Sequence, residues 1–241
     1  MQDIVWNPWH GCHKISPGCK HCYMYRRDAE FGKDSSIVTK TKNFSLPVMK
    51  KRDGSYKIPP QSHVYACMTS DFFLEDADPW RDDIWAMIDQ RRDLQFTIIT
   101  KRISRMRVCL PRDWGEGYNH VRICATCENQ STADARIPHL LALSIKHRSL
   151  IHEPMLEAID IEPYLKTGLI ERVICGGESG PESRLCDYAW ILQTREQCLK
   201  YNVDFIFKQT GRLFKKDSRI YVIPRKIQMS QARKANINLY F

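Results

Sequence analysis

The chain has 241 residues, a hydrophobic fraction of 43% and a net charge of +9, from 37 lysines and arginines against 28 aspartates and glutamates. Its length suits one domain spanning 1–241, and (β/α) barrels often reach this size. No run of 18 apolar residues occurs, so no transmembrane helix is expected. The positive charge favours an anionic partner, although a solvated basic surface explains it equally well. Basic residues gather at 40–57, 91–112 and 208–234.

A short predicted strand at 3–6 leads into a loop in which Cys12, Cys19 and Cys22 are spaced C-x6-C-x2-C. Glycines precede the first two cysteines and let the backbone close around a bulky group. Three thiolates are one fewer than a closed structural zinc or iron–sulfur site normally uses. The pattern therefore predicts a metal centre with an open position, an iron–sulfur cluster in preference to zinc. The histidines that offer zinc a fourth ligand are His10, His13 and His21.

Ten cysteines occur in the chain, but a chain of this length does not need disulfides to stabilise its core. Residues 1–5 are not the apolar stretch of a secretory signal, so we expect reduced thiols and a cytoplasmic protein. Cys124 and Cys127 form a second C-x2-C. Residues three apart on a strand face opposite sides, so we expect buried core thiols there.

Two segments depart from regular periodicity. Residues 33–60 are rich in Lys, Ser, Pro and Gly, and we expect an insertion: a lid, a hairpin around Asp53-Gly54, or a plain surface loop. Residues 212–241 are expected to form a basic C-terminal extension.

Seven short apolar runs rich in β-branched and aromatic residues are predicted strands, most of them followed by polar residues. The runs are 3–6, 63–68, 95–99, 121–127, 148–151, 172–175 and 204–207. They lack clean alternation, as strands buried on both faces do.

Predicted helices lie between the strands. One begins at Asp78-Pro79 with proline at its first position, a second is capped by Ser131 and continues to Ile145, and a third is capped by Asp187. Alternating strands and helices predict an α/β fold, a partial (β/α) TIM-like barrel of six or seven parallel strands. In such a barrel the polar strand ends surround one face, which holds the active site.

The motifs resemble a radical S-adenosylmethionine (SAM) family, specifically the phage and prophage radical-SAM-like family of uncharacterised function. Its signature is similar to WNPWxGCxKxSxGCxxCY, which matches residues 6–23, and the likeness continues in order to Phe207-Lys208-Gln209. The cysteine signature and the GGESG segment at 176–180 are its specific parts. The usual superfamily spacing is C-x3-C-x2-C, so the longer first gap departs from it.

The resemblance implies a radical SAM type of barrel and a [4Fe-4S] cluster held by Cys12, Cys19 and Cys22, with SAM chelated by the fourth iron. Reductive cleavage of SAM would give a 5′-deoxyadenosyl radical, with the electron supplied by a donor such as flavodoxin or ferredoxin. Tyr23 is expected near the adenine. The other expected cofactor contacts are Ser70, Asp71, Glu128, Gly176, Gly177 and Glu178. A GGE-like element usually follows the second strand of such enzymes, whereas Gly176-Gly177-Glu178 follows a later one.

The substrate is expected to be anionic, a small molecule or a nucleic acid, and to dock on the strand-end face. The candidate contacts are Lys101, Arg102, His152, Glu153, Arg184 and Lys208. Alternatively, the lysines and arginines among these residues pair with Glu128, Glu153 and Glu178 in a structural ion network. A zinc-stabilised nucleic-acid-binding protein without radical chemistry is the alternative function.

Overall fold

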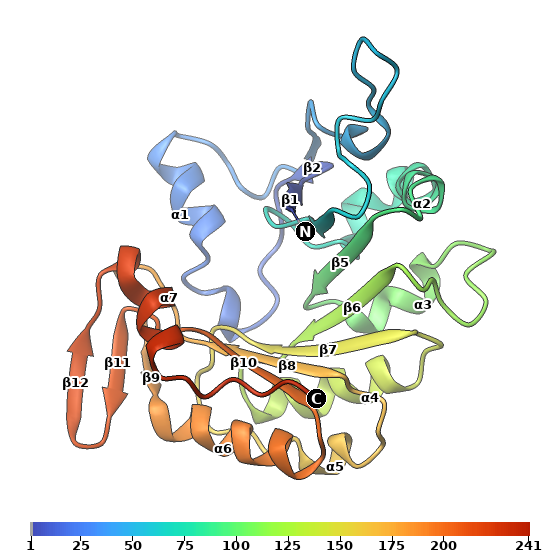
Figure 1. Ribbon diagram of the computed structural model, residues 1–241. Helices are drawn as coiled ribbons and strands as arrows, with labels where there is room; N and C mark the ends of the chain where they lie inside the picture. The colour runs from blue at the N-terminus through green and yellow to red at the C-terminus, as the bar shows by residue number, and fades with distance from the viewer. Residues whose placement is uncertain (1) are drawn as a thin grey trace. The chain divides into compact units, whose positions relative to one another are not determined.

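Seven strands form the main sheet of the computed structural model, which describes residues 2–241 (Figure 1). They are β1 (Asp3–Trp6), β4 (His63–Ala66), β5 (Gln95–Thr100), β6 (Val121–Thr126), β7 (His147–His152), β8 (Arg172–Gly176) and β10 (Asp204–Gln209). Their order in the sheet follows the chain, and β1 pairs with β4, β4 with β5, β7 with β8, and β8 with β10 in parallel. The prediction of an α/β fold with sequential parallel strands is confirmed.

The chain divides into two compact units whose segments alternate along the sequence. Unit 1 comprises 1–13, 24–124 and 143–147, and unit 2 comprises 14–23, 125–142 and 148–241. The cysteine loop passes from unit 1 to unit 2 between His13 and Lys14. Cys12 therefore belongs to unit 1, whereas Cys19 and Cys22 belong to unit 2.

Unit 1 contains an aromatic core beside its strands. Trp6 meets Phe96 edge to face, and the Phe72 and Trp85 rings meet in the same way, with centroids 5.1 Å apart. The remaining elements are β2 (Trp9–His10), α1 (Tyr23–Glu30), β3 (Thr39–Lys40), η2 (Leu46–Val48), η3 (Glu75–Trp80), α2 (Arg81–Gln90), η4 (Ile103–Arg105) and α3 (Met106–Cys109). In the segment 33–60, Lys50 and Tyr56 bridge antiparallel across a turn at Gly54, which has a φ of +84°.

Helix α2 begins at Arg81, so the prediction of Asp78 as the cap and Pro79 as the first helical residue was wrong by two residues. Residues 75–80 instead form the 3₁₀ helix η3, with Pro79 inside it. The buried Arg81 guanidinium explains this, because it donates to the Leu74 carbonyl at 2.8 Å and to Asp78 at 2.9 Å and so tightens the turn.

Unit 2 contains helices α4 (Gln130–Leu141), α5 (Glu162–Leu165) and α6 (Tyr188–Lys200). Helix α6 packs on β8 and β10, and α5 lies beside α6 (Figure 1). Asp187 caps α6 as predicted, accepting from the Ala189 amide at 2.9 Å. The predicted Ser131 cap of α4 was wrong: Asn129 caps it, and the helix ends at Leu141 rather than Ile145. Asn129 lies in an extended conformation that lets its side chain reach the Thr132 amide.

A second sheet in unit 2 has the order β12-β11-β9, formed by β9 (Leu185–Asp187), β11 (Leu213–Lys216) and β12 (Arg219–Val222). Helix α7 (Arg225–Lys234) follows it. Along the described residues, no helix combines the length and the apolar character that crossing a membrane demands.

Candidate functional site

The first part of the cysteine loop is held by its backbone in unit 1. Gly11 has a φ of +101°, and a Cβ there would come within 2.4 Å of the Ile37 carbonyl oxygen, so only glycine fits. The Cys12 amide donates to the Ser35 carbonyl at 2.8 Å, and the Ser70 hydroxyl donates to the Gly11 carbonyl. Ser70, a predicted cofactor contact, thus holds the loop.

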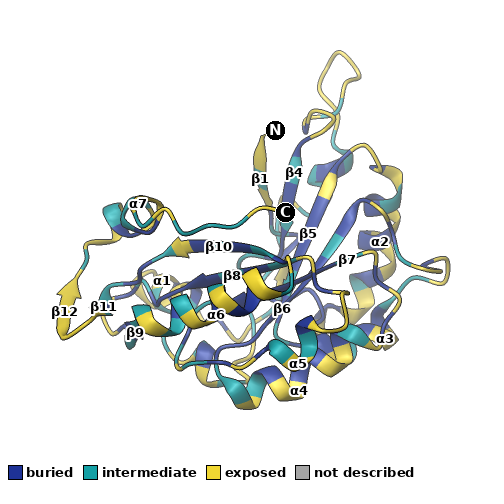
Figure 2. Ribbon diagram, turned by 60° about the horizontal axis from the view of Figure 1, so that its bottom comes forward, coloured by how far each residue is buried: buried dark blue, intermediate teal, exposed yellow. Residues whose placement is uncertain are grey.

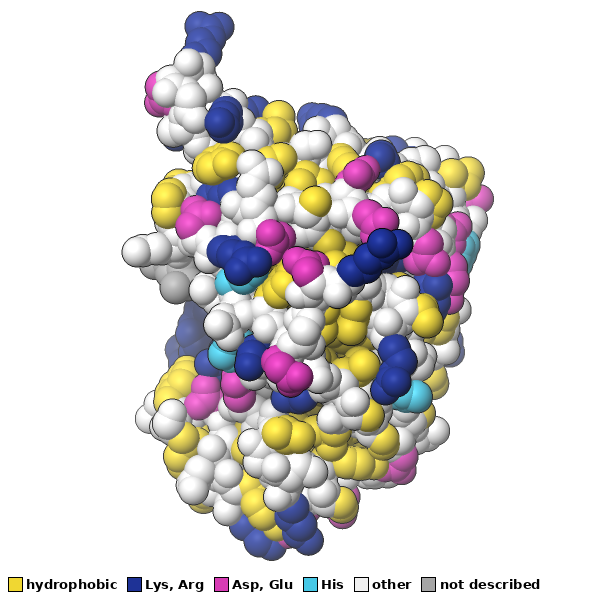
Figure 3. Space-filling view, turned by 90° about the vertical axis from the view of Figure 1, so that its right-hand side faces the viewer, with side chains coloured by type: hydrophobic (Ala, Val, Ile, Leu, Met, Phe, Trp, Pro, Cys, Tyr) yellow, Lys and Arg dark blue, Asp and Glu magenta, His cyan; other side chains and the backbone are white. Residues whose placement is uncertain are grey.

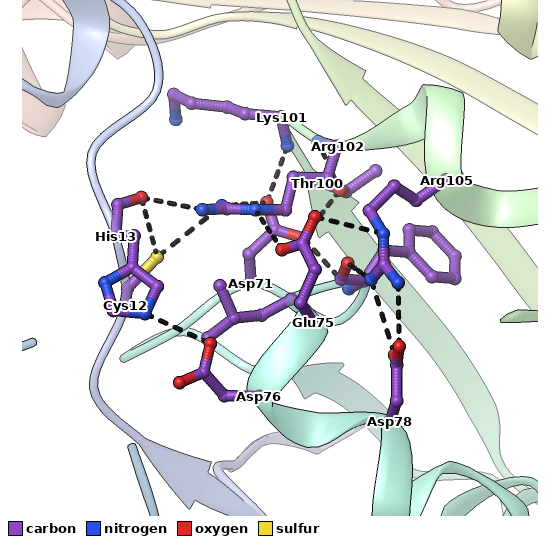
Figure 4. A network of polar contacts seen from close by, with 12 residues as sticks. Cys12, His13, Asp71, Glu75, Asp76, Asp78, Thr100, Lys101, Arg102 and Arg105 are labelled. Carbon is purple, nitrogen blue, oxygen red and sulfur yellow. Dashed lines mark hydrogen bonds and ion pairs between the residues drawn. The ribbon is translucent and has the colours of Figure 1, made fainter. Parts of the chain in front are cut away.

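Asp71 organises the strand-end residues of unit 1 (Figure 4). It is 5% exposed, and its carboxylate accepts from the Thr100 hydroxyl at 2.7 Å and from the Lys101 amide at 2.8 Å. The Phe73 amide donates to it at 3.0 Å. Both oxygens are therefore used inside the protein, and the predicted cofactor ligand Asp71 fixes the turn after β5.

Arg102 connects this turn to Cys12. Its guanidinium is buried and lies 3.7 Å from Asp71, so charge is balanced. It donates to the Cys12 sulfur at 3.7 Å and to the His13 carbonyl at 2.8 Å (Figure 4). The predicted substrate contact Arg102 is thus a buried cation directed at a cysteine of the signature.

An outer row of ion pairs surrounds Arg102. Glu75 lies 3.6 Å from Arg102 and 3.0 Å from Arg105, and Arg105 also pairs with Asp78 at 2.7 Å (Figure 4). Burial alone would raise the pKa of Asp78, but hydrogen bonds from Arg105 and Arg81 outweigh it and hold that pKa below its usual value. This side of the loop is therefore fixed by charge as well as by backbone contacts.

In unit 2, Glu128 seats the second part of the loop. It is fully buried, accepting from the Gly18 amide at 3.0 Å and from Arg136 at 2.7 Å. A Cβ on Gly18 would approach the Glu128 carboxyl carbon to 2.9 Å, so the glycine before Cys19 allows this close contact. Glu128, another predicted cofactor ligand, is occupied by these two partners.

The GGESG segment supports the same part of the loop. A Cβ on Gly177 would lie 2.3 Å from the Thr210 carbonyl oxygen, so glycine is required where the residues just after β8 and β10 meet. Glu178 binds the Arg184 guanidinium at 2.7 Å, and Arg184 donates to the Pro17 carbonyl at 2.9 Å. Burial would raise the pKa of Glu178, but hydrogen bonds from Arg184 keep it below its usual range.

The remaining predicted residues of unit 2 lie at the ends of β7, β8 and β10. Glu153 pairs with Lys208 at 2.6 Å and also accepts from Gln209. A Cβ on Gly176 would lie 3.1 Å from Glu153, so this contact is close as well. With Arg184 on Glu178 and Arg102 beside Asp71 and Glu75, three of the four predicted substrate cations are engaged by carboxylates. Glu153 and Glu178 are two of the acceptors that the ion-network alternative names.

His152 is fully buried, and its Nδ1 lies 2.6 Å from the Cys127 carbonyl oxygen. Its Nε2 has no hydrogen-bond partner among the described residues. Burial lowers the pKa of His152 to about 4, so the ring is neutral at pH 7. A neutral imidazole that donates through Nδ1 keeps an acceptor lone pair on Nε2.

Tyr23 follows the last signature cysteine and is 42% exposed. Its pKa is raised to about 12, first because the protein shields the hydroxyl from water and then through the charges of Cys22 and Glu153. Arg225 opposes this shift, which places the start of α7 close to the phenol.

The ten cysteines fall into two groups. All are free thiols; Cys12, Cys19 and Cys22 are partly exposed, and the other seven are buried. The three residues predicted to hold a cluster are thus the accessible thiols among the described residues, which fits thiolate ligation. Within residues 2–241, no three His, Cys, Asp or Glu side chains are grouped as a metal site.

Sequence reasoning missed the residues that hold the loop. Arg136, Ser35 and Tyr25, whose hydroxyl donates to the Cys12 carbonyl, all contact the loop or its supports. Ser35 and Tyr25 lie on segments without a strong motif. Only Arg136 carried a signal, as an arginine on a helix face otherwise occupied by Ala133, Ile137 and Leu140.

A family model described as "Protein of unknown function (DUF5131)" matches residues 1–238. No curated protein and no solved structure matches the chain.

Proposed function

The chain belongs to the DUF5131 family, and for this member we propose a radical SAM enzyme in which Cys12, Cys19 and Cys22 hold one [4Fe-4S] cluster. The observation that carries the proposal is the coincidence of the three-cysteine signature with the three partly exposed thiols. Each part of the loop is also anchored by buried charged groups, Arg102 in unit 1 and Glu128 in unit 2. Such supports keep metal ligands in position.

When bound, the cluster would supply the electron that cleaves SAM to methionine and a 5′-deoxyadenosyl radical. The protein's own residues would hold the thiolates and balance their negative charge. Arg102 supplies a hydrogen bond to the Cys12 sulfur, and an N–H donor beside a ligating sulfur stabilises the more reduced state. Tyr23 is proposed to line the adenine position, while Asp71, Glu128 and Glu178 position the loop.

The substrate of this enzyme is proposed to be anionic. Lys101 remains the best candidate contact at the end of β5, because its amide anchors to Asp71 while no carboxylate pairs with its ammonium group among residues 2–241. His152 is proposed as a hydrogen-bond acceptor for substrate through its Nε2.

Zinc is the competing metal. Each nearby histidine already has one ring nitrogen on a carboxylate: His10 on Asp28 at 2.8 Å, His13 on Asp76 at 3.0 Å and His21 on Glu182 at 3.2 Å. Such pairs leave the second nitrogen for a metal. Metal analysis therefore has to separate the two functions.

The test is anaerobic reconstitution with iron and sulfide, followed by metal, sulfide and electron paramagnetic resonance analysis. We expect about four irons and four sulfides per chain, as a [4Fe-4S] centre requires, together with 5′-deoxyadenosine after adding SAM and dithionite. Cys19→Ser should lose the cluster, and the buried-site control Cys109→Ser should keep it. Stoichiometric zinc with no iron uptake, or a full cluster in Cys19→Ser, would contradict the proposal.

A further inference from the structure

The positive charge of the protein is concentrated in one short segment. Residues 208–234 hold nine lysines and arginines and a single acidic residue, Asp217. The rest of the chain keeps 28 basic and 27 acidic residues and is almost neutral. The nine are Lys208, Arg212, Lys215, Lys216, Arg219, Arg225, Lys226, Arg233 and Lys234. On the face in Figure 3, by contrast, acidic and basic side chains are mixed.

Within this segment, strands β11 and β12 pair antiparallel as a two-stranded ribbon, which is anchored to the rest of unit 2 through β11. Strand β11 is central in the second sheet, and its Phe214 is buried against Phe207 and Tyr188, with ring centroids 5.9 and 5.7 Å away. Strand β12 is the edge strand, and all four of its residues are exposed (Figure 2). The central strand β11 is therefore fixed by its buried phenylalanine, and the edge strand β12 beside it is exposed.

The ribbon places charge and an aromatic ring on one face. Residues paired directly across two antiparallel strands share a face. Lys216 pairs with Arg219, and Phe214 with Tyr221, so all four lie on the same side. Phe214 is the buried residue of this side, and Arg219 and Tyr221 lie on its exposed strand β12. Tyr221 is 43% exposed, so its ring is available for stacking.

The basic side chains in this segment differ in their partners. Lys208 and Lys215 pair with Glu153 and Asp187. In the part of the chain that the structure describes, the outer ones have no carboxylate partner: Arg219, Arg225, Lys226, Arg233 and Lys234. Unpaired cations repel one another and are stabilised by a bound polyanion.

We propose that the β11–β12 ribbon and helix α7 together form a nucleic-acid-binding surface. Lysines and arginines neutralise successive phosphates, arginine with a bidentate fork, and an exposed tyrosine stacks on a base. Helix α7 suits a membrane poorly, because it directs Gln228 and Ala232 inward and presents no broad apolar face outward. Strand β12 does expose Ile220 and Val222, so the vesicle measurement below separates a membrane from a nucleic acid. Nucleic-acid binding at this surface needs no metal, so its test is independent of the proposed radical chemistry.

The experiment measures fluorescence anisotropy of labelled single-stranded DNA, duplex DNA and single-stranded RNA against the metal-free full chain across a salt series. Probes of about 20 nucleotides exceed a typical single-strand site of roughly 4–16. The variant Arg219→Ala/Arg225→Ala/Lys226→Ala should weaken binding at least about tenfold. It should also reduce the slope of log K against log salt by about two to three, roughly one for each phosphate that is no longer neutralised.

A matched control removes the same charge elsewhere. Lys51→Ala/Arg52→Ala/Arg112→Ala deletes two arginines and a lysine that are exposed in unit 1. It should leave affinity within about twofold and change the slope little, because only cations that touch phosphates release counterions. Equal weakening in both triple variants would show a general charge effect and overturn the proposal.

Tyr221→Ala tests the surface without changing its charge. It should weaken single-strand binding about fivefold or more, as removal of one base–aromatic stack does, and leave the salt slope unchanged. Thermal melting verifies folding, and single variants at Arg219 and Arg225 replace the triple if it does not fold. Absence of nucleic-acid binding in the wild type, or an effect of the triple variant confined to binding of phosphatidylserine vesicles, would overturn the assignment.

Discussion

Arg102 places a permanent positive charge and an N–H donor beside the Cys12 sulfur, at 3.7 Å. We predict that Arg102→Lys lowers the reduction potential of the reconstituted cluster, because a lysine keeps the charge near Asp71 but lacks the guanidinium fork. The shift should be on the order of 100 mV, the one-electron equivalent of a charge-assisted hydrogen bond of about 1.5–3 kcal/mol. A redox titration followed by electron paramagnetic resonance measures it.

Arg105→Lys is the control for this change, because Arg105 pairs with Glu75 and Asp78 and donates no hydrogen bond to a signature cysteine among the described residues. The reduction potential of the cluster in Arg105→Lys should match that of the wild type. Equal potentials in all three proteins would contradict the role given to Arg102.

His152 makes stability depend on pH. Its folded pKa of about 4 lies below the value near 6.5 expected of an unfolded histidine. The unfolded state therefore binds more protons between these two values, and this residue's contribution to stability is present above pH 6.5 and lost as the pH falls toward 4. The loss between pH 7 and pH 5 should be about 2 kcal/mol.

Urea denaturation of wild type and His152→Gln at pH 7 and pH 5 tests this prediction. Other groups titrate in both proteins, so the difference between their pH dependences isolates His152. The variant should lose about 2 kcal/mol less than the wild type on acidification. Parallel pH dependences would show that His152 is not buried in its neutral form.

The sequence identified the cysteines because their spacing is a local property of the chain. It could not show how Asp71, Glu128 and Glu178 are used. Each carboxylate lies at a predicted strand end. Asp71 and Glu128 take partners from distant segments, Thr100 and Gly18, and Glu178 reaches the distant cysteine loop only through Arg184. The polar strand ends were therefore located correctly, while their contacts depended on tertiary structure.

At the level of elements, the start of α4 is decided by a capping box in which the Asn129 side chain accepts from the Thr132 amide and the Thr132 hydroxyl accepts from the Asn129 amide. We predict that Asn129→Ala destabilises the protein by about 1 kcal/mol, a usual cost for losing an N-cap. Thermal or urea unfolding measures it. Ser131→Ala is the control at an exposed position inside the first turn, and should stay within about 0.5 kcal/mol of wild type. A larger loss at Ser131 would return the cap to that residue.

The strands were predictable because runs such as 95–99 and 204–207 are apolar and rich in β-branched or aromatic residues over a strand's length. The ends of the helices were less predictable from the sequence. The start of α2 depends on Arg81 reaching back to Leu74, and that of α4 on the extended backbone of Asn129. In the local sequence, Pro79 and Ser131 are as good helix-start signals as Arg81 and Asn129. Only the side-chain contacts of Arg81 and Asn129 show where the two helices begin.

For the whole molecule, thiol accessibility divides the ten cysteines into three and seven. Burial raises the pKa of Cys186 and Cys198 to about 12, and that of Cys67 and Cys175 well above the usual value. Reactivity requires an exposed thiolate.

We therefore predict that iodoacetamide alkylates Cys12, Cys19 and Cys22 in the native metal-free protein, and all ten cysteines in denaturant. Peptide mass spectrometry reads the sites. Reconstitution with iron and sulfide should protect the three. Rapid alkylation of Cys67 or Cys175 under native conditions would contradict the burial described above.

The interleaving of the two units has a consequence for synthesis of the chain. The cysteine loop at 14–23 leaves the ribosome early, but its supports Glu128 and Arg184 belong to much later segments. At translation rates of roughly 5–20 residues per second, Gly18 waits on the order of ten to thirty seconds for Arg184 to be made. During that interval the Cys19 and Cys22 thiols lack the residues that later support their loop. Oxygen present during expression should therefore oxidise the thiols of the nascent chain more readily than those of the folded protein.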